Sequence, residues 1–190
     1  LVAKLAKNDF LPTGPCDTRE LWEKITARSL NRPIHDGLVC HGTHPVRAEG
    51  VKNLPLLRAV AGPQQAAFTD KALHDFTHSS YTLTPDCDRM ACRLEGPIIE
   101  TVRGSDILSD GIAAGSVQVS TNGQPIVMLA DHQTTGGYAK IATVISADLP
   151  MLAQLRPGQS VCFTFVTPQQ AVQAARRQAE LLQAVAARLD

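Results

Sequence analysis

The chain has 190 residues, of which 44% are hydrophobic and 19% charged, a composition typical of a globular domain and not of a disordered one. Lys plus Arg and Asp plus Glu each number 18, so the net charge is zero, which disfavours binding to nucleic acid or to an anionic membrane surface. The longest apolar runs, such as residues 126–130, are too short to span a bilayer, and no charged-then-apolar leader opens the chain. We therefore expect a cytoplasmic protein with no nucleic-acid or membrane partner.

Residues 1–55 show little regular pattern. Asp17 to Leu30 has a weak helical periodicity, and residues 31–55 hold the prolines and glycines typical of a loop. We expect three parts: an N-terminal segment and linker over residues 1–55, a domain over residues 56–166, and a C-terminal helix over residues 167–190.

Residues 56–166 alternate short apolar segments with turn signals such as Asn122-Gly123. Many short strands at this spacing favour a β-barrel or sandwich. Short helices are expected at Phe68–Phe76 and Leu149–Leu155. The predicted strands are Leu56–Val60, Ser80–Leu83, Arg93–Leu94 continuing into Ile98–Ile99, Ser116–Val119, Ile126–Leu129, Ile141–Ile145 and Val161–Val166.

The C-terminal segment has the pattern of a long amphipathic helix. Thr167, Pro168 and Gln170 supply a capping residue, a proline at the first helical position and a glutamine at the third. Apolar residues then recur at positions 172, 175, 179, 182, 186 and 189, which lie on one face of a helix. We expect this face to pack on its own domain, with a partner helix as the alternative.

The segment from Asp131 to Tyr138, with sequence DHQTTGGY, directly follows the apolar run 126–130. A buried strand that ends here delivers hydrogen-bond donors and acceptors to one place. The expected roles are a base or ligand-orienting group at Asp131, binding of a carboxylate or ureido group by Gln133 and Thr134, and a cap from Tyr138. The last candidate residues of the segment are Thr135, Gly136 and Gly137.

The two glycines of this segment allow positive φ angles and a close backbone approach to a ligand. Successive N–H groups in such a turn cradle an anionic oxygen in other proteins. The alternative is a tight β-turn whose polar side chains only satisfy the backbone. The pattern alone leaves both interpretations open.

Two more residues are candidates for ligand binding. Arg89 follows Asp88 and is suited to holding a carboxylate through two hydrogen bonds, the alternative being an ion pair with Asp88 that fixes a turn. Gln118 lies on a predicted strand, where it faces either a pocket or solvent. The small-residue segment Ser109–Gly115 before this strand is expected to be a loop.

No metal site is expected. The five cysteines, at positions 16, 40, 87, 92 and 162, include no C-x-x-C pair, and His35, His41 and His44 lack the regular spacing of metal ligands. We expect free, mostly buried thiols in a reducing compartment.

Several segments together resemble one known family. They include Leu56-Leu57-Arg58, Gly62-Pro63-Gln64, Asp88-Arg89-Met90, Arg93–Gly96, Ser109–Gly111, Gly115–Val119, Asn122–Val127, Asp131–Tyr138, Lys140–Ala142, Ala147–Leu149 and Pro157–Gln159. In this order they resemble the biotin-dependent carboxyltransferase family, also called allophanate hydrolase subunit 2 or KipA-like. The likeness is nearest to its 5-oxoprolinase branch, and residues 5–12 resemble the segment that closes the first half of such proteins.

The resemblance implies a cyclophilin-like β-barrel with short helices, in a chain that corresponds to the second half of family members. It also implies a partner protein similar to allophanate hydrolase subunit 1 (KipI-like), a third 5-oxoprolinase subunit, and a small amide or lactam substrate. The expected catalytic residues are Asp131, Gln133 and Tyr138. The expected substrate-binding residues are Arg89, Gln118, Thr134, Thr135, Gly136 and Gly137.

The function implied first is that of a subunit in an ATP-dependent 5-oxoprolinase, which opens 5-oxoproline to glutamate and binds ATP elsewhere in the complex. One alternative is a carboxyltransferase domain that uses biotin and acts on urea or a related amide. The other is a non-catalytic, KipA-like regulatory subunit. Both reactions require a polarised lactam or ureido carbonyl, so the residues of the site do not separate them.

Overall fold

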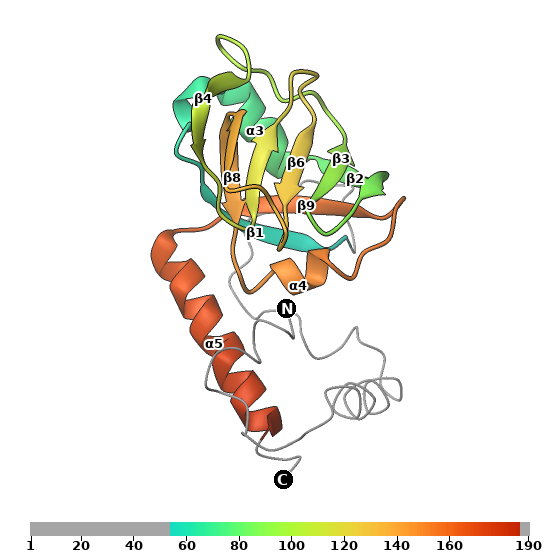
Figure 1. Ribbon diagram of the computed structural model, residues 1–190. Helices are drawn as coiled ribbons and strands as arrows, with labels where there is room; N and C mark the ends of the chain where they lie inside the picture. The colour runs from blue at the N-terminus through green and yellow to red at the C-terminus, as the bar shows by residue number, and fades with distance from the viewer. Residues whose placement is uncertain (1–53, 187–190) are drawn as a thin grey trace. The chain divides into compact units, whose positions relative to one another are not determined.

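The computed structural model describes residues 54–186 of the chain (Figure 1). The predicted helix over residues 17–30, the histidines at 35, 41 and 44, and the cysteines at 16 and 40 lie outside these residues. The described elements are, in chain order, β1 (Leu56–Ala61), the short 3-10 helix η1 (Gln65–Ala67), α3 (Asp70–His78), β2 (Ser80–Cys87), β3 (Ala91–Glu95), β4 (Asp106–Gly111), β5 (Ser116–Val119), β6 (Pro125–Met128), β7 (Thr135–Tyr138), β8 (Lys140–Val144), α4 (Leu149–Leu152), β9 (Ser160–Phe165) and α5 (Pro168–Ala186).

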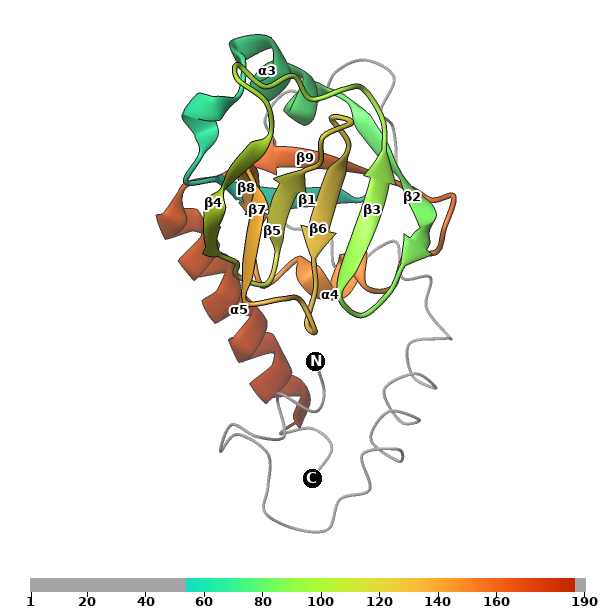
Figure 2. The same ribbon diagram turned by 45° about the horizontal axis from the view of Figure 1, so that its top comes forward.

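Seven of these strands close into a barrel in the order β1-β8-β5-β6-β3-β2-β9. Strands β1 and β9 pair in parallel and so close the barrel. All other neighbouring strands of the barrel pair antiparallel. The remaining strands, β4 and β7, form a separate two-stranded sheet beside the barrel (Figure 2). The predicted mainly β architecture, a barrel with short helices and a C-terminal helix, is confirmed.

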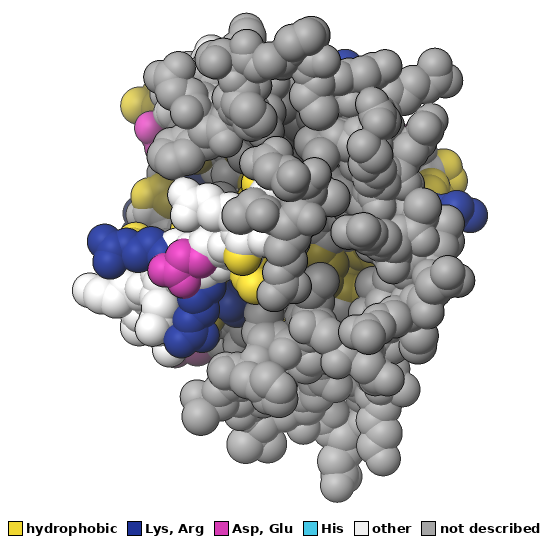
Figure 3. Space-filling model, turned by 90° about the horizontal axis from the view of Figure 1, so that it is seen from below, with side chains coloured by type: hydrophobic (Ala, Val, Ile, Leu, Met, Phe, Trp, Pro, Cys, Tyr) yellow, Lys and Arg dark blue, Asp and Glu magenta, His cyan; other side chains and the backbone are white. Residues whose placement is uncertain are grey.

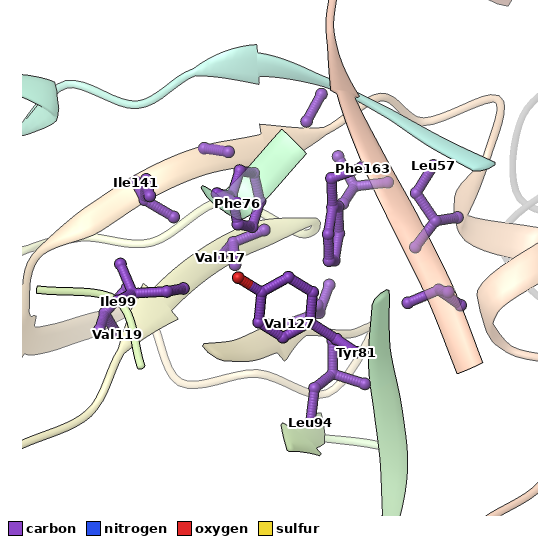
Figure 4. Packing of buried hydrophobic residues seen from close by; sticks show 14 of the residues in the cluster. Leu57, Phe76, Tyr81, Leu94, Ile99, Val117, Val119, Val127, Ile141 and Phe163 are labelled. Carbon is purple, nitrogen blue, oxygen red and sulfur yellow. The ribbon is translucent and has the colours of Figure 1, made fainter. Parts of the chain in front are cut away.

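The barrel interior is an apolar core built on alternation along the strands. Phe76 of α3 stacks on Phe163 of β9 with ring centroids 4.5 Å apart, and the ring of Tyr81 on β2 meets Phe163 edge-on (Figure 4). Val117 and Val127 fill the same interior and are fully buried. Each large aromatic side chain removed from water contributes about 1.5–3 kcal/mol, so this cluster stabilises the barrel that positions the site.

The helices form where their local signals lie, with shifted ends. α3 begins two residues later than predicted because Thr69 caps it, its hydroxyl oxygen accepting the Ala72 N–H at 3.1 Å. α4 ends at Leu152, three residues before the predicted end. Arg58 on β1 ties the start of α4 to the barrel through a two-pronged contact with Asp148, its Nη2 donating to Oδ1 at 2.6 Å.

The predicted start of α5 is confirmed in detail. The Thr167 hydroxyl accepts the Gln170 N–H at 3.2 Å, and the Gln170 side chain accepts the Thr167 N–H at 2.8 Å, a reciprocal capping box. The prediction that its apolar face packs on the domain is wrong for most of the length: Ala175 is half-buried, but Val172 is 52% and Leu182 49% exposed. None of the helices between residues 54 and 186 is both long and apolar enough to cross a membrane.

Three predicted features of the strands are wrong. Ile98 and Ile99 lie in a coil segment after β3, not in a continuation of it. The first residues of the segment expected to be a small-residue loop, Ser109–Gly111, belong to strand β4, which pairs with β7. Strand β7 is formed by the Thr-Gly-Gly-Tyr sequence expected to be a turn. The two segments form hydrogen bonds between their backbone N–H and carbonyl groups when they pair. Neither segment's own sequence indicates this pairing.

The described surface mixes charge and apolar groups. In the view of Figure 3, from the α4 side, basic, acidic and hydrophobic side chains of the described residues lie next to one another. This agrees with the zero net charge of the sequence. The large exposed apolar side chains are spread over several elements: Met90, Ile98, Val102, Leu108, Val172, Leu181 and Leu182.

Candidate functional site

Gln118 projects from the outer wall of the barrel. Its neighbours Val117 and Val119 on β5 are buried in the interior, and successive side chains of a strand point to opposite faces, so Gln118 faces outward. In the strand register it lies opposite Ile126 of β6 on one side and Lys140 of β8 on the other. Gln118 is nevertheless only 2% exposed, because β7 covers it: its Nε2 donates to the Tyr138 carbonyl at 3.4 Å.

Three of the predicted residues meet where β7 crosses Gln118, and we call Gln118, Gln133 and Gly136 the β7 site. A Cβ atom placed on Gly136 would lie 2.8 Å from Nε2 of Gln118 and 3.3 Å from Nε2 of Gln133. It would also lie 2.6 Å from the Cδ1 of Ile112. Because Gly136 has no side chain, the carboxamides of Gln118 and Gln133 can both lie close to its backbone.

This arrangement corrects the expected role of the glycines. Gly136 and Gly137 lie in the extended strand β7, and the glycines with positive φ are Gly104, Gly115, Gly123 and Gly158. The predicted cradle of successive N–H groups in a positive-φ turn is thus wrong. Close approach is the property of glycine that Gly136 uses, whereas a Cβ on Gly137 would meet only the Ile107 carbonyl oxygen at 3.5 Å, an ordinary contact.

Asp131 and Arg89 form an ion pair next to this region of the chain. Nε of Arg89 lies 2.8 Å from Oδ2 of Asp131, and Nη2 lies 3.3 Å from Oδ1. The Asp131 N–H also donates to the Arg89 carbonyl at 3.0 Å. The two side chains are 46% and 85% exposed respectively, so solvent screens the pair, and such exposed pairs contribute about 0–1 kcal/mol.

The alternative partner for Arg89, Asp88, instead fixes the β2–β3 turn by itself. Its Oδ1 accepts the N–H groups of Met90 at 2.7 Å and Ala91 at 2.9 Å. These backbone hydrogen bonds lower the pKa of the Asp88 carboxyl below its ordinary value. Arg89 is therefore left at the tip of a preformed turn, where its guanidinium reaches Asp131.

The other predicted residues lie along the β4–β7 sheet. The Thr134 carbonyl accepts the Ile112 N–H at 3.0 Å, and Thr135 pairs with Gly111 of β4. Tyr138 pairs with Asp106 and is two residues from Gly136, so it faces the same side of β7. Within residues 54–186, no hydrogen bond joins the β7 site to the Arg89–Asp131 pair, so the structure brings the predicted residues together in two neighbouring groups.

A buried lysine that sequence reasoning did not select holds the β4–β7 sheet on the barrel. The Lys140 side chain is 3% exposed, and its Nζ lies 2.8 Å from Oδ2 of Asp110 on β4. Gln64 completes the contact: its Nε2 donates to the same carboxylate oxygen at 3.0 Å, and its Oε1 accepts the Lys140 N–H at 3.2 Å. We call Gln64, Asp110 and Lys140 the latch.

The latch lowers the pKa of the Asp110 carboxyl, chiefly through the Lys140 hydrogen bond and then through Gln64. One signal in the sequence could have pointed to it: Lys140 is the single charged residue within the apolar segment 139–145. A lysine in such a position needs a partner to offset its burial.

Comparison with known proteins now decides the family. A sequence model of the family described as "Carboxyltransferase domain, subdomain A and B" matches residues 2–165. The chain belongs to this family. Two curated relatives, each named as the C subunit of 5-oxoprolinase, are 40% identical: the Haemophilus influenzae protein over 146 residues, or 75% of this chain, and the Escherichia coli K12 protein over 148 residues, or 76%. The chain spans about half of each relative, 47% of its length.

A solved structure supports the fold of this carboxyltransferase-family chain. The K. lactis urea amidolyase superposes with a TM-score of 0.64 over 73% of this chain and 9% of that protein, at 21% identity. At this identity the likeness is one of fold. It agrees with the barrel described above.

Two other features of this family member lie apart from the site. His74 and His78 on α3 stack with ring centroids 3.9 Å apart, and the residues from 54 to 186 contain no group of three or more His, Cys, Asp or Glu side chains placed to hold a metal ion. A hollow of about 300 Å³ lies between α5 and the strands β1 and β8, lined mostly by apolar residues such as Val60 and Val172. None of the predicted site residues lines it.

Proposed function

We propose that this chain is part of a subunit of an ATP-dependent 5-oxoprolinase, which converts 5-oxoproline to glutamate together with partner subunits. The observation that carries the proposal is the 40% identity, over three quarters of the chain, to two proteins named as the C subunit of 5-oxoprolinase. The partners proposed are a protein similar to allophanate hydrolase subunit 1 and a third subunit, with ATP bound elsewhere in the assembly. The reaction is assigned to the cytoplasm.

In this proposal the β7 site receives the lactam. A lactam presents one N–H donor and one carbonyl acceptor in a plane, and a carboxamide offers both a donor and an acceptor to match it. Gln133 is exposed and Gln118 buried, so Gln133 is free to turn towards a ligand while Gln118 stays fixed on the Tyr138 carbonyl. Backbone close to the bare Gly136 completes the surface against which a small ring packs.

Arg89 and Asp131 supply the charged groups of the proposed site. The substrate carries a carboxylate, which a guanidinium binds through two hydrogen bonds. Because the Arg89–Asp131 pair is exposed and weak, a substrate carboxylate can take the place of Asp131 on Arg89. Asp131 is then released to act as a base or to orient the lactam N–H. Tyr138 is proposed to line the site on the side of β7 that Gly136 faces, with Thr134, Thr135 and Gly137 as further binding residues along the same segment.

Carboxyl transfer is the second candidate, and the name of the matching family favours it. A biotin ureido group presents N–H donors and a carbonyl acceptor, and the exposed Gln133 carboxamide beside Gly136 fits such a group. When bound, biotin would supply a carried carboxyl group. Gln133 would orient the bound amide or ureido group in this case, as it orients the lactam in the first, while Gln118 stays on the Tyr138 carbonyl.

The test is an assay of 5-oxoproline-dependent ATP hydrolysis by the protein in its complete form, mixed with its candidate partner subunits. We expect glutamate and ADP to form at equal rates, and we expect avidin to leave the rate of ATP hydrolysis unchanged. Inhibition by avidin, or carboxylation of urea, would support the carboxyltransferase candidate. A stable complex without 5-oxoproline-dependent ATP hydrolysis would instead support a non-catalytic, KipA-like role.

A further inference from the structure

Two cysteines face each other at the base of the β2–β3 hairpin. Cys87 ends β2 and lies directly opposite Cys92 of β3 in the strand register. The next pair towards the turn is hydrogen bonded, since the Asp88 N–H donates to the Ala91 carbonyl at 3.0 Å. Pairs alternate along an antiparallel ladder, so Cys87 and Cys92 are a non-hydrogen-bonded pair, whose Cα atoms typically lie about 4.5 Å apart. That separation is within the range of about 4.4–6.8 Å found in disulfides.

The two side chains are neighbours across the hairpin. Both are free cysteines, directly opposite each other in the strand register, and the Cys87 thiol contributes to the raised pKa of Cys92. Cys87 is half-buried, and its Sγ also lies 3.7 Å from the Arg93 carbonyl oxygen. Cys92 is 4% exposed, and burial raises the pKa of its thiol to about 12. A small oxidant therefore reaches Cys87 first, with Cys92 held beside it.

We propose that Cys87 and Cys92 form a reversible disulfide when the protein meets a peroxide. The Cys87 thiolate attacks one peroxide oxygen, the O–O bond breaks, and the departing oxygen takes a proton to leave as water or an alcohol. Cys87 is left as a sulfenic acid. The sulfur of Cys92 then attacks the sulfur of Cys87, the S–O bond breaks, and hydroxide leaves with the Cys92 proton as water. The two thiols lose two electrons in total, and one peroxide gains them.

The disulfide would act on the turn that carries Arg89, because the two cysteines bracket it. The Met90 and Arg89 carbonyls accept the N–H groups of Leu129 at 2.8 Å and Asp131 at 3.0 Å. Opposite residues in a ladder have Cβ atoms about 4.5–5.5 Å apart, whereas a disulfide holds them at about 3.8 Å. Oxidation therefore draws the two strands together at the base of the turn and restrains the segment that holds Asp131.

Mass spectrometry of the full chain tests the proposal. The protein is treated with hydrogen peroxide, its remaining thiols are alkylated, and it is digested with trypsin without reduction. Trypsin cleaves after Lys71, Arg89 and Arg93, so Cys87 lies in the peptide 72–89 and Cys92 in the peptide 90–93. We expect these peptides to remain joined, at a mass about 2 Da below their sum, and to separate after treatment with dithiothreitol.

Variants make the result specific. Cys162→Ser should keep the joined peptides. Cys92→Ser should lose them and accumulate a sulfenic acid at Cys87 that dimedone traps. The proposal is overturned if the peptides stay separate at full oxidation, if Cys87 proceeds to a sulfinic acid while Cys92 stays a thiol, or if Cys162 is the partner found.

Hydrogen exchange tests the effect on the neighbouring segment. In the oxidised protein, the amides of Leu129 and Asp131 should exchange more slowly than in the reduced protein, because the turn that accepts them opens less often. Equal exchange rates in the two states would refute the effect on the Arg89 turn. Both readouts are independent of any 5-oxoprolinase activity.

Discussion

A single methyl group at Gly136 probes the β7 site directly. In Gly136→Ala the new Cβ would lie 2.6 Å from Cδ1 of Ile112 and 2.8 Å from Nε2 of Gln118, distances that real Cβ atoms essentially never show. The atoms that must move are the ends of two flexible side chains and not backbone. We therefore expect the fold to survive, the Gln118 carboxamide to be displaced, and the Gln133 carboxamide, at 3.3 Å, to give by a few tenths of an ångström.

The expected magnitudes follow from this geometry. Overpacking a well-packed site costs about 1–3 kcal/mol, and flexible neighbours place this variant at about 1–2 kcal/mol. For a chain of this size each kcal/mol lowers Tm by about 2–4 °C, so crowding lowers Tm by roughly 2–8 °C relative to a glycine-to-alanine change without crowding. A displacement of about 1 Å at a reacting site costs about 100-fold in rate. We therefore expect kcat/KM of Gly136→Ala to fall by about 100-fold while the protein stays folded.

Gly137→Ala is the matched control. Its Cβ would meet only the Ile107 carbonyl oxygen at 3.5 Å, and both glycines lie in the same extended strand. Each substitution reduces the entropy of the unfolded chain to the same extent, which stabilises the fold by about 0.4–1 kcal/mol. The difference in Tm between the two variants therefore isolates the effect of crowding. We expect Gly137→Ala to match or exceed the wild-type Tm.

The assays are thermal unfolding of each variant and steady-state kinetics of 5-oxoproline-dependent ATP hydrolysis in the assembled complex. Equal Tm values and equal kcat/KM for the two variants would refute the close approach at Gly136. A large loss of Tm without a loss of kcat/KM would mean that Gly136 serves packing alone.

Three further predictions concern stability. Asp148→Ala removes the carboxylate that accepts hydrogen bonds from both the guanidinium and the backbone N–H of Arg58. The free energy of unfolding, measured with urea, should fall by about 2–3 kcal/mol, because Arg58 keeps some exposure to solvent. An unchanged free energy of unfolding would contradict this. Lys140 lowers the pKa of Asp110, so the ionised Asp110 contributes to stability above about pH 4, and this contribution is lost as the pH falls below that. The difference in Tm between wild type and Asp110→Asn should therefore shrink on acidification. A difference in Tm that does not change with pH would contradict this. Thr167→Ala removes a helix cap worth about 1 kcal/mol, so helical circular dichroism should fall at temperatures well below the global transition, and an unchanged signal would count against the capping box.

The barrel was predictable because its strands carry strong local signals. Segments such as Ser116–Val119 and Val161–Val166 are apolar, short and separated by turn residues. The β4–β7 sheet was not, since five of the six β4 residues are exposed and its burial does not alternate. The sequence of β7, TGGY, places two glycines, which are depleted in strands, at its centre, so its strand form depends on pairing with β4.

The site was predictable in its residues but not in its arrangement. The run from Asp131 to Tyr138 is polar after a buried strand, which marks it as a candidate. The ion pair between Asp131 and Arg89 joins residues 42 positions apart, and nothing local signals it. The same holds for the latch between Lys140 and Asp110, whose contact depends on how the β4–β7 sheet lies on the barrel.

The most direct measurement of the central claim is the 5-oxoproline-dependent ATP hydrolysis of the assembled complex carrying Asp131→Ala. Asp106→Asn on the neighbouring strand serves as its control, since it also removes a charge but not the proposed base. We expect Asp131→Ala to lose about 100-fold or more in kcat. Its stability should stay within about 1 kcal/mol of wild type because the Arg89 pair is exposed. Full activity of Asp131→Ala, in a complex that assembles normally, would mean that Asp131 is not a catalytic residue.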